Sequence, residues 1–546
     1  MTLMLPPPDP ALKVSVVIPA HNEEELVGSC LTALAEQSGI SAEEYEVLLV
    51  LDRCTDGTEE RALEVAAEHP DLRLHLINGP GRGAGYARRA GMEEACARLL
   101  SLGSPDGLIA STDADTVVAL DWLLVQLQAA ARGARAIGGR IELREAGVLP
   151  HDVYDWRDEQ GRLKKRELLS ASSDGTMQAE HWQFSGASLA LTAATYGEIG
   201  GIEPRTALED EYLERTLTMR GIPIERPLSV RVATSARTVG RARRGLARDL
   251  ALASWVHNNT YDARDFDVQD LSEKKRASGA SVSAIVPTKG KGCGGAALLD
   301  ALQPLSEAGL VDETIVLRQD EESEVLSDKG VEVYRDAELM PGFGPVRGYG
   351  DALWRGLSVA RGEIVLFLDA SVPDPDGSRT LGLLGPLLVR EDLCFVKGFS
   401  GEPADAGEGT TGLSELVARP LINVYMTELA GFIEPLSLEF AARRGLLASL
   451  PFPVGYGAAL SLLFDAARSA GVESLAQARL DPRPSERIPL PDLGEAAYAT
   501  IVAVTARMHR DDLEEHAPGP LFLPGSKHFE QRRVAVEERP PVGTCQ

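Results

Sequence analysis

What the sequence lacks already excludes several classes of protein. No apolar run reaches the roughly 18 residues of a membrane-spanning helix, so we expect no integral membrane segment. Positive charge is scarce, because 55 lysines and arginines stand against 82 aspartates and glutamates, for a formal net charge of −27. Nucleic acids and anionic membranes bind basic surfaces, so this charge predicts no nucleic-acid partner.

Cysteine is rare as well. The chain has six cysteines, and no two of them form a CxxC pair of the kind that binds zinc or closes a disulfide. Scattered free thiols are typical of a reducing compartment, and the opening MTLMLPPPDPALK has no basic segment of a signal peptide. We therefore expect a soluble cytoplasmic protein. Its 546 residues exceed what one core holds and predict two or three domains.

Two similar strands open the two halves of the chain, VSVVIPA at 14–20 and VSAIVPT at 282–288. Each is rich in β-branched residues and ends at a proline, as a buried parallel strand does where it meets a loop. Predicted strands and helices alternate after each of them, which favours a mainly parallel α/β sheet in each half. We predict two tandem α/β domains at 1–271 and 281–505, a linker at 272–280 and a loosely ordered tail at 506–546.

Two carboxylates follow one of the predicted strands. In LIASTDADTVV (108–118), Asp113 and Asp115 are two residues apart, which puts both side chains on one side and roughly 6 to 7 Å apart along the backbone. Ligands of α/β sheets bind beyond such strand ends. Mg²⁺ and Mn²⁺ are typically held by one or two carboxylates and by phosphate oxygens. The pair predicts a metal–diphosphate site, and the alternative is a solvated acidic turn.

The motifs of the first half resemble one enzyme family. VSVVIPAHNEEELVGSCLTAL, VLLVLDRCTDGT, GRGAGYARRAG, STDADT and ALEDEYL follow one another across residues 13 to 255. Their order and spacing are similar to those of the family 2 glycosyltransferases, which have the GT-A fold. The resemblance implies a transferase that moves a sugar from a nucleotide-diphospho-sugar to a hydroxyl acceptor, with Mg²⁺ or Mn²⁺ as cofactor.

The same resemblance implies roles for single residues. Asp113 and Asp115 match the metal and donor pair, and Asp210 matches the general base that an inverting transfer needs. Glu209 and Glu211 should raise the pKa of Asp210, unless this acidic triplet is only the first turn of a helix. The positions that match the nucleotide-sugar site are Pro19, His21, Glu23, Asp52, Gly83, Arg88 and Asp113.

A run of arginines follows in an otherwise acidic chain. Guanidinium groups pair well with phosphate oxygens, so this segment at 235–249 predicts a loop that closes over the diphosphate, and a solvated basic helix face is the alternative. The family's QxxRW motif is absent here. The arginines are Arg237, Arg241, Arg243, Arg244 and Arg248, of which Arg241 and Arg244 are our candidate ligands.

A further segment, FSGASLAL at 184–191, matches the part of the family that lies between donor and acceptor. The resemblance therefore implies an acceptor pocket lined by Trp182, Gly186 and Ala187. For Trp182 and its neighbour His181, packing in the protein interior is the simpler interpretation.

Residues 281 to about 500 resemble a second family, the glucosyl-3-phosphoglycerate synthases of family 81, which also have the GT-A fold. The resemblance is carried by GYGDALWRGLSVARGEIVLFLDA, FVKGF, SELVARPLI and AQARL. Its chemical positions differ from that family, since the metal pair is reduced to Asp369 with Ser371, a lysine is replaced by Tyr349, and a metal histidine corresponds to Ser485. Residues 258–508 contain no histidine at all.

The resemblance thus implies a vestigial second site around Asp369, Glu439 and Arg483. Our preferred hypothesis is a metal-dependent inverting glycosyltransferase that works from the first half. Two alternatives stay open: retaining transfer of the synthase type by the second half, and nucleotide-sugar binding without catalysis. In the preferred hypothesis the second half is a scaffold, an acceptor platform or the surface of a homodimer.

Overall fold

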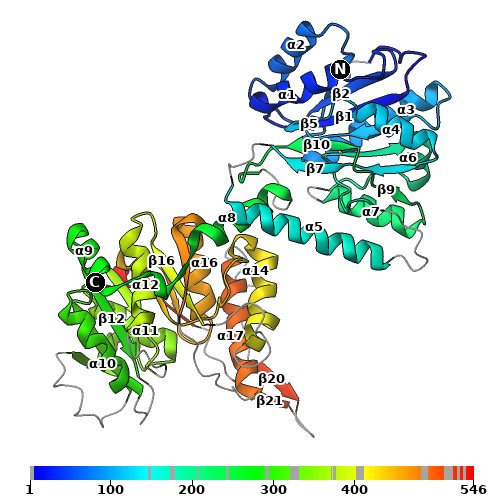
Figure 1. Ribbon diagram of the computed structural model, residues 1–546. Coiled ribbons are helices and arrows are strands. Elements are labelled where there is room, and N and C mark those ends of the chain that lie inside the picture. Colours follow the sequence, from blue (N-terminus) through cyan, green and yellow to red (C-terminus); the bar gives the residue numbers. More distant parts are fainter. Residues whose placement is uncertain are drawn as a thin grey trace. The chain divides into compact units, whose positions relative to one another are not determined.

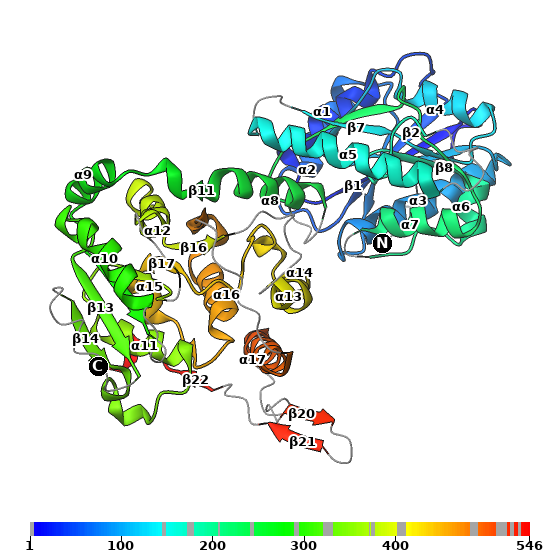
Figure 2. The ribbon, with the colours of Figure 1, turned by 60° about the horizontal axis from the view of Figure 1, so that its bottom comes forward.

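The computed structural model of the chain consists of two compact units, Met1–Ser254 and Trp255–Gln546 (Figures 1 and 2). No helix among the described residues combines the length and the apolar character that crossing a membrane requires. The described residues are 5–144, 149–171, 179–205, 208–240, 245–288, 294–319, 331–370, 372, 377–400, 411–480, 490–508, 521–524, 529–532 and 537–545.

The N-terminal unit is built on a seven-stranded sheet with the order β3-β2-β1-β4-β8-β6-β9. Only β8 runs antiparallel to its neighbours. Every residue of β1 and β2 is buried, because helices cover both faces of the sheet, as their continuous apolar sequences predict. The strands are β1 (Val14–Ala20), β2 (Tyr45–Leu51), β3 (Leu74–Asn78), β4 (Leu108–Ser111), β6 (Ala136–Gly138), β8 (Leu189–Thr192) and β9 (Ile224–Glu225).

The two faces of this sheet carry two separate hydrophobic cores. Val16 and Ile18 of β1 pack on the face covered by α1, α2 and α4, whereas Val17 points to the face covered by α3, α6 and α7. The helices are α1 (Glu24–Ala35), α2 (Thr58–Glu68), α3 (Ala84–Ser101), α4 (Trp122–Ala131), α6 (Ala193–Ile199) and α7 (Glu209–Met219). Two more, α5 (His151–Ala171) and α8 (Leu246–Asn259), contribute to a small cluster with Val153 and Leu250.

A three-stranded sheet lies next to the acidic pair. It has the order β5-β10-β7, formed by β5 (Thr116–Val118), β7 (Arg140–Leu143) and β10 (Arg231–Thr234). Strand β5 begins directly after Asp115, and Thr116 is the register partner of Thr234. The sheet therefore brings the end of β10, and Arg237 just beyond it, to the acidic pair.

The C-terminal unit repeats the strand order of the first. Its eight strands are arranged β14-β13-β12-β15-β17-β16-β19-β11, and only β17 is antiparallel to its neighbours. Its first seven positions match the first sheet one by one, with β17 in the place of β8. The strands are β11 (Thr260–Asp262), β12 (Val282–Pro287), β13 (Glu313–Arg318), β14 (Glu332–Arg335), β15 (Ile364–Phe367), β16 (Phe395–Phe399), β17 (Phe440–Arg443) and β19 (Leu475–Arg479).

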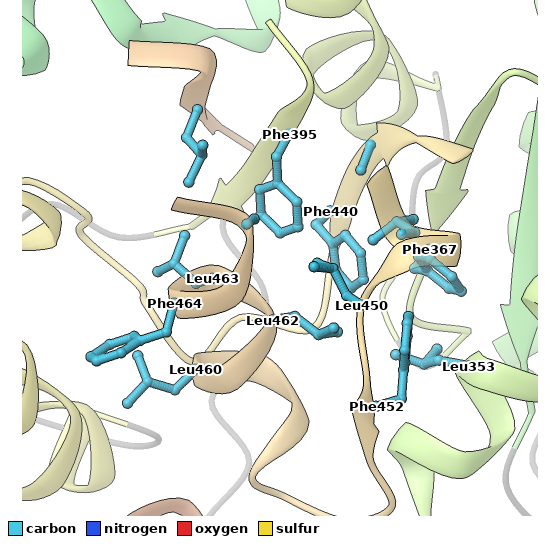
Figure 3. Close-up of a cluster of buried hydrophobic side chains, with 14 of the residues drawn as sticks. Leu353, Phe367, Phe395, Phe440, Leu450, Phe452, Leu460, Leu462, Leu463 and Phe464 are labelled. Atoms are coloured by element: carbon cyan, nitrogen blue, oxygen red, sulfur yellow. The ribbon is translucent and has the colours of Figure 1, made fainter. Parts of the chain in front are cut away.

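Aromatic side chains fill the core on one face of this second sheet. The Phe440 ring lies 5.2 Å from that of Phe395 and 4.7 Å from that of Phe367, and leucines of α11 and α16 surround them (Figure 3). Helices α9, α10 and α12 pack on the other face. The helices are α9 (Val268–Ser278), α10 (Gly294–Glu307), α11 (Tyr349–Val359), α12 (Ser378–Val389), α13 (Thr411–Leu413), α14 (Arg419–Tyr425), α15 (Arg444–Ser449), α16 (Ala458–Ala470) and α17 (Leu490–Met508).

The predicted α/β class agrees with this architecture. The expected linker at 272–280 overlaps α9, whose Leu271 is buried in the core of the C-terminal unit. The expected loose tail also differs at its end, where Val542 is buried and the carbonyl of Pro540 accepts a hydrogen bond from Trp354 Nε1 at 2.7 Å. The remaining strands are β18 (Phe452–Pro453), β20 (Leu521–Pro524), β21 (Phe529–Arg532) and β22 (Glu538–Arg539), of which β22 pairs with β18.

A buried ion pair joins β2 to α3 and gives a test of this packing. Arg98 donates to both carboxylate oxygens of Glu46, at 2.8 and 2.6 Å. Burial raises the pKa of Glu46, but the hydrogen bonds from Arg98 and His75 outweigh burial and lower the pKa to about 2. Because the pKa in the folded chain lies below the value of about 4.3 in unfolded chains, the pair stabilises the fold above that pH and loses its effect toward pH 2.

We expect Glu46→Gln to lower the free energy of unfolding by about 3 kcal/mol at pH 7, because it leaves Arg98 buried without its countercharge. Calorimetric melting at pH 7 and at pH 3 measures the effect, and the difference from the unmodified chain should shrink at the lower pH. Exposed Glu43, changed to Gln, is the control and should have little effect at either pH. An equal loss at both pH values would contradict this account.

Candidate functional site

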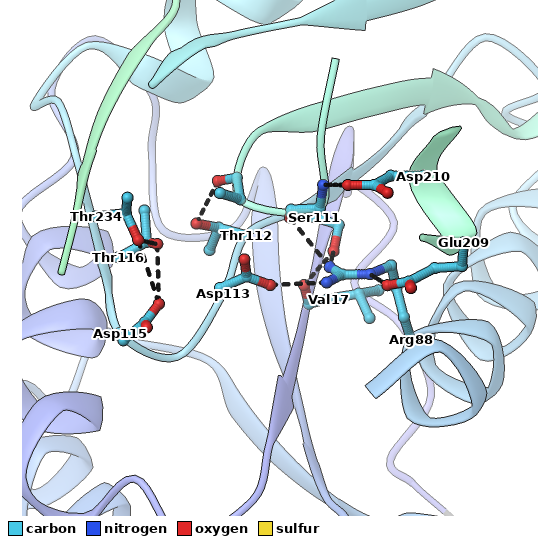
Figure 4. A network of polar contacts seen from close by, with 12 residues as sticks. Val17, Arg88, Ser111, Thr112, Asp113, Asp115, Thr116, Glu209, Asp210 and Thr234 are labelled. Carbon is cyan, nitrogen blue, oxygen red and sulfur yellow. Dashed lines mark hydrogen bonds and ion pairs between the residues drawn. The ribbon is translucent and has the colours of Figure 1, made fainter. Parts of the chain in front are cut away.

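The two acidic residues of STDADT lie where β1 and β4 end side by side. These strands are parallel, with Val17 opposite Ser111, so the loops that follow them meet at one edge of the sheet. The start of α7 and the loop before β8 reach the same edge, because Asp210 accepts the Gly186 N–H and Arg88 joins Glu209 to Asp113 (Figure 4). Four segments that are far apart in the sequence therefore supply the site.

The side chain of Arg88, in α3, connects these segments by hydrogen bonds. Its guanidinium donates to Asp113 Oδ1 at 2.7 Å, to Glu209 Oε1 at 3.1 Å, to Ser111 Oγ at 2.5 Å and to the Gly186 carbonyl at 3.0 Å (Figure 4). Burial opposes its charge, but the neighbouring carboxylates raise the pKa of Arg88, so the side chain stays charged. All these partners belong to the protein, whereas the sequence suggested a contact with the nucleotide sugar.

Asp115 has different surroundings. Its Oδ2 lies 2.7 Å from Arg237 Nη2, and the same guanidinium donates to both oxygens of Glu23 at 3.0 Å each. The hydroxyl groups of Thr116 and Thr234 approach Asp115 Oδ1 at 3.3 and 3.4 Å. Burial and the charge of Asp113 raise the pKa of Asp115 to about 6 against the opposing effect of Arg237. Asp115 and Glu23 therefore share the guanidinium of Arg237.

Asp210 lies in the first turn of α7 and is held by backbone amides. Its Oδ2 accepts the Gly186 N–H at 3.0 Å, and its Oδ1 accepts the Glu211 N–H at 2.9 Å (Figure 4). Leu208, just before the helix, has a left-handed backbone with φ of 60°, which costs energy for a branched side chain. Glu209 is instead buried beneath the site, against Arg88.

Of the residues predicted to line the nucleotide, Pro19 lies within β1, His21 follows β1 and Asp52 follows β2. Asp52 accepts the amides of Gly81 and Gly83 at 2.5 and 2.8 Å, so its carboxylate holds the loop that leads into α3. His21 Nδ1 lies 2.7 Å from the Asp52 carbonyl oxygen, and Pro19 is paired with β2. The expected contact of Asp52 with a base stays a prediction.

The predicted acceptor residues divide into two groups. Gly186 and Ala187 lie at the site, where the Ala187 carbonyl accepts a hydrogen bond from Thr112 at 2.8 Å. Trp182 is half-buried, and the ammonium group of exposed Lys164 lies 4.2 Å from its ring centre. His181 is buried, and burial lowers its pKa to about 4.

The arginine segment contributes a residue that the sequence did not single out. Arg237 reaches Asp115, whereas the candidates Arg241 and Arg244 lie outside the described residues. All five arginines of the segment have the same chemistry, and the pairing of β10 with β5 brings Arg237 to Asp115. The four hydrogen-bond partners of Arg88 could not be predicted from the sequence either, because the contacts span up to 121 residues.

The corresponding edge of the C-terminal unit is organised differently. Asp369 follows β15, but Ser371 and Arg483 lie outside the described residues. Glu439 forms an ion pair with Arg379, and both side chains are 2% exposed. Burial raises the pKa of Tyr349, and the charges of Asp369 and Glu439 add to this effect.

Comparisons with known proteins agree with these features. The model of the family described as Glycosyl transferase family 2 matches residues 15–177. The glucosyl-3-phosphoglycerate synthase of Mycolicibacterium smegmatis is 32% identical over 303 residues, which cover 53% of this chain and 97% of the relative. That of Mycobacterium tuberculosis H37Rv is 34% identical over 304 residues, covering 52% and 91%.

A solved structure of the M. tuberculosis synthase, in complex with Mn²⁺ and uridine-diphosphate-glucose, is 32% identical and covers 52% of this chain and 96% of that one, with a TM-score of 0.44. The sequence relatives, which the chain matches over nearly their whole length, define the class of protein: the chain is a glycosyltransferase. More particularly, it belongs to the glucosyl-3-phosphoglycerate synthase family. The enzyme class expected from the motifs is thus confirmed.

Two glycines test the contact between Arg88 and the loop before β8. A methyl group on Gly186 would lie 2.4 Å from Arg88 Nη2, whereas one on exposed Gly197 of α6 would meet nothing within 4 Å. We expect Gly186→Ala to destabilise the unit by about 1–3 kcal/mol, because the fixed guanidinium cannot move aside. Gly197→Ala, the matched control, should instead stabilise its helix slightly. Thermal melting compares the two variants, and equal melting temperatures would contradict this role of Arg88.

Proposed function

We propose that the N-terminal unit moves a sugar from a nucleotide-diphospho-sugar to a hydroxyl acceptor. One observation carries the proposal: Arg88 and Gly186 hold Asp113 and Asp210 at the same edge of the sheet. Direct transfer requires the donor and the acceptor hydroxyl to be bound next to each other. Asp113 can serve donor binding, and Asp210 can accept the proton of the hydroxyl. The family 2 match over residues 15–177 supports the proposal because it includes the acidic pair.

A divalent cation fits the charge of this edge. Asp115 and Glu23 share the guanidinium of Arg237, and a metal ion would supply further positive charge to these carboxylates. Among the described residues no group of three or more His, Cys, Asp or Glu side chains could hold a metal ion by itself. This agrees with Mg²⁺ or Mn²⁺ held by Asp113 and Asp115 together with diphosphate oxygens. The bound ion would supply charge that stabilises the departing diphosphate.

Asp210 suits the general base of an inverting transfer. Two backbone amides fix the direction of its carboxylate, and the remaining lone pairs can accept a proton from the acceptor hydroxyl. Glu209, a catalytic candidate from the sequence as the neighbour of Asp210, is bound to Arg88 and so serves better as a positioning residue. Around this centre, Pro19, His21 and Gly83 would line the nucleotide.

Variants of the two carboxylates test the proposal. We expect Asp210→Asn to slow transfer by about 10²–10⁴-fold and to leave donor binding intact, because it removes only the proton acceptor. Asp115→Asn should abolish Mn²⁺-dependent donor binding as well. The assay is mass spectrometry of products from a panel of uridine- and guanosine-diphosphate sugars. Exposed Glu211, changed to Gln, is the control beside Asp210, and undiminished transfer by Asp210→Asn would refute the assigned base.

The second candidate is retaining transfer to a phosphoglycerate by the C-terminal unit. The synthase relatives support it, since their name describes glucosyl transfer to 3-phosphoglycerate. The shared strand order supports a GT-A fold for both units. Against catalysis, Glu439 is already neutralised by buried Arg379. We therefore favour the C-terminal unit as an acceptor platform or homodimer surface, in a cytoplasmic enzyme whose described cysteines are free.

A single exchange separates the two candidates. We expect Asp369→Asn in the full chain to leave sugar transfer unchanged with every acceptor, 3-phosphoglycerate included, because the working carboxylates belong to the first unit. Asp115→Asn is the matched comparison and should abolish transfer. The reverse pattern, with activity lost in Asp369→Asn and kept in Asp115→Asn, would assign the reaction to the C-terminal unit.

A further inference from the structure

The two aspartates of the acidic pair are neutralised by two arginines of very different freedom. Arg88, the partner of Asp113, is 3% exposed and bound to four parts of the protein. Arg237, the partner of Asp115, is 31% exposed and lies just beyond the end of β10. The first arginine is fixed in the interior, whereas the second can turn toward solvent without opening the core.

Arg237 occupies the place beside Asp115 that a bound metal ion would take. Its Nη2 lies 2.7 Å from Asp115 Oδ2, within the distance of a charge-assisted hydrogen bond. A divalent ion bound at Asp115 would meet this guanidinium at close range and be repelled by it. Glu23 offers the guanidinium a second carboxylate, with both oxygens at 3.0 Å. Arg237 can therefore leave Asp115 and still keep a partner.

We propose, on the basis of the proposed function, that Arg237 is an exchangeable counter-ion of the metal site. It neutralises Asp115 while the site is without a cation, cedes Asp115 when a divalent ion arrives with a nucleotide diphosphate, and then faces the diphosphate while Glu23 retains it. Arg237 is thus a positioning residue that couples metal binding to donor binding. Thr116 and Thr234, on paired strands, hold the other oxygen of Asp115 during the exchange.

The exchange predicts effects of opposite sign on two ligands. Without nucleotide, Arg237 competes with the metal, so its removal should tighten Mn²⁺ binding. With a nucleoside diphosphate present, Arg237 contributes a positive charge to the phosphates, so its removal should weaken binding of the nucleotide. A residue that only stabilised the loop would weaken both.

The experiment uses the full chain and Mn²⁺ alone, followed by Mn²⁺ with UDP or GDP. Electron paramagnetic resonance of free Mn²⁺ gives the metal affinity, and Asp115→Asn identifies the signal of this site among weaker sites of the acidic chain. We expect Arg237→Gln to tighten Mn²⁺ binding at this site about tenfold and to weaken nucleotide binding, measured by calorimetry, about tenfold. Arg237→Lys, which keeps the charge, should lie between.

Arg140→Gln is the matched control, because Arg140 forms an exposed pair with Glu142 at 3.1 Å in the same unit. It should change neither affinity. Unchanged or weaker Mn²⁺ binding in Arg237→Gln, with a melting temperature like that of the unmodified chain, would overturn the exchange and leave the proposed function standing. Mn²⁺ binding that is the same in Asp115→Asn as in the unmodified chain would overturn both.

Discussion

The buried guanidinium of Arg88 joins parts of the N-terminal unit that are up to 121 residues apart in the sequence. A buried charge is costly unless its hydrogen bonds are satisfied, so each partner of Arg88 is held where the others need it. Asp113 faces the predicted donor side and the Gly186 carbonyl the predicted acceptor side. The distance between the proposed donor site and the proposed acceptor site therefore depends on the side chain of Arg88.

The two units share a strand order but balance their acidic residues in different ways. In the first, the acidic pair is divided between a fixed arginine and a partly exposed one, which leaves room for an added cation. In the second, Glu439 is paired with Arg379 inside the protein, where 2% of either side chain is exposed. A buried arginine such as Arg379 is a fixed countercharge that cannot turn aside for a cation. The same sheet can thus support a working site or a static one, depending on where its positive charge lies.

Much of the architecture was readable from local sequence, because strands and helices follow from residue patterns a few positions long. The β-branched runs that contain Pro19 and Pro287 predicted the first strand of each sheet. Contacts between distant segments were not readable. Val542 lies in a proline-rich stretch that looks like a loose tail, yet it is buried, because the β18–β22 pairing draws it onto the core.

Because contacts between distant segments cannot be read from local sequence, the sequence predicted an acidic site for a metal and a diphosphate but not the arginine contacts within it. A pair of metal-binding carboxylates can be recognised from its spacing, because both residues are close together in the sequence. An arginine acts at the end of a long side chain, so arginines of one segment, such as Arg237 and Arg248, can contact different groups. What selects Arg237 is the register of β10 against β5, which puts Thr234 beside Thr116 and hence the following loop beside Asp115. The electrostatics of this site is thus a property of strand pairing, and a change that shifted the register would remove the counter-ion without touching a charged residue.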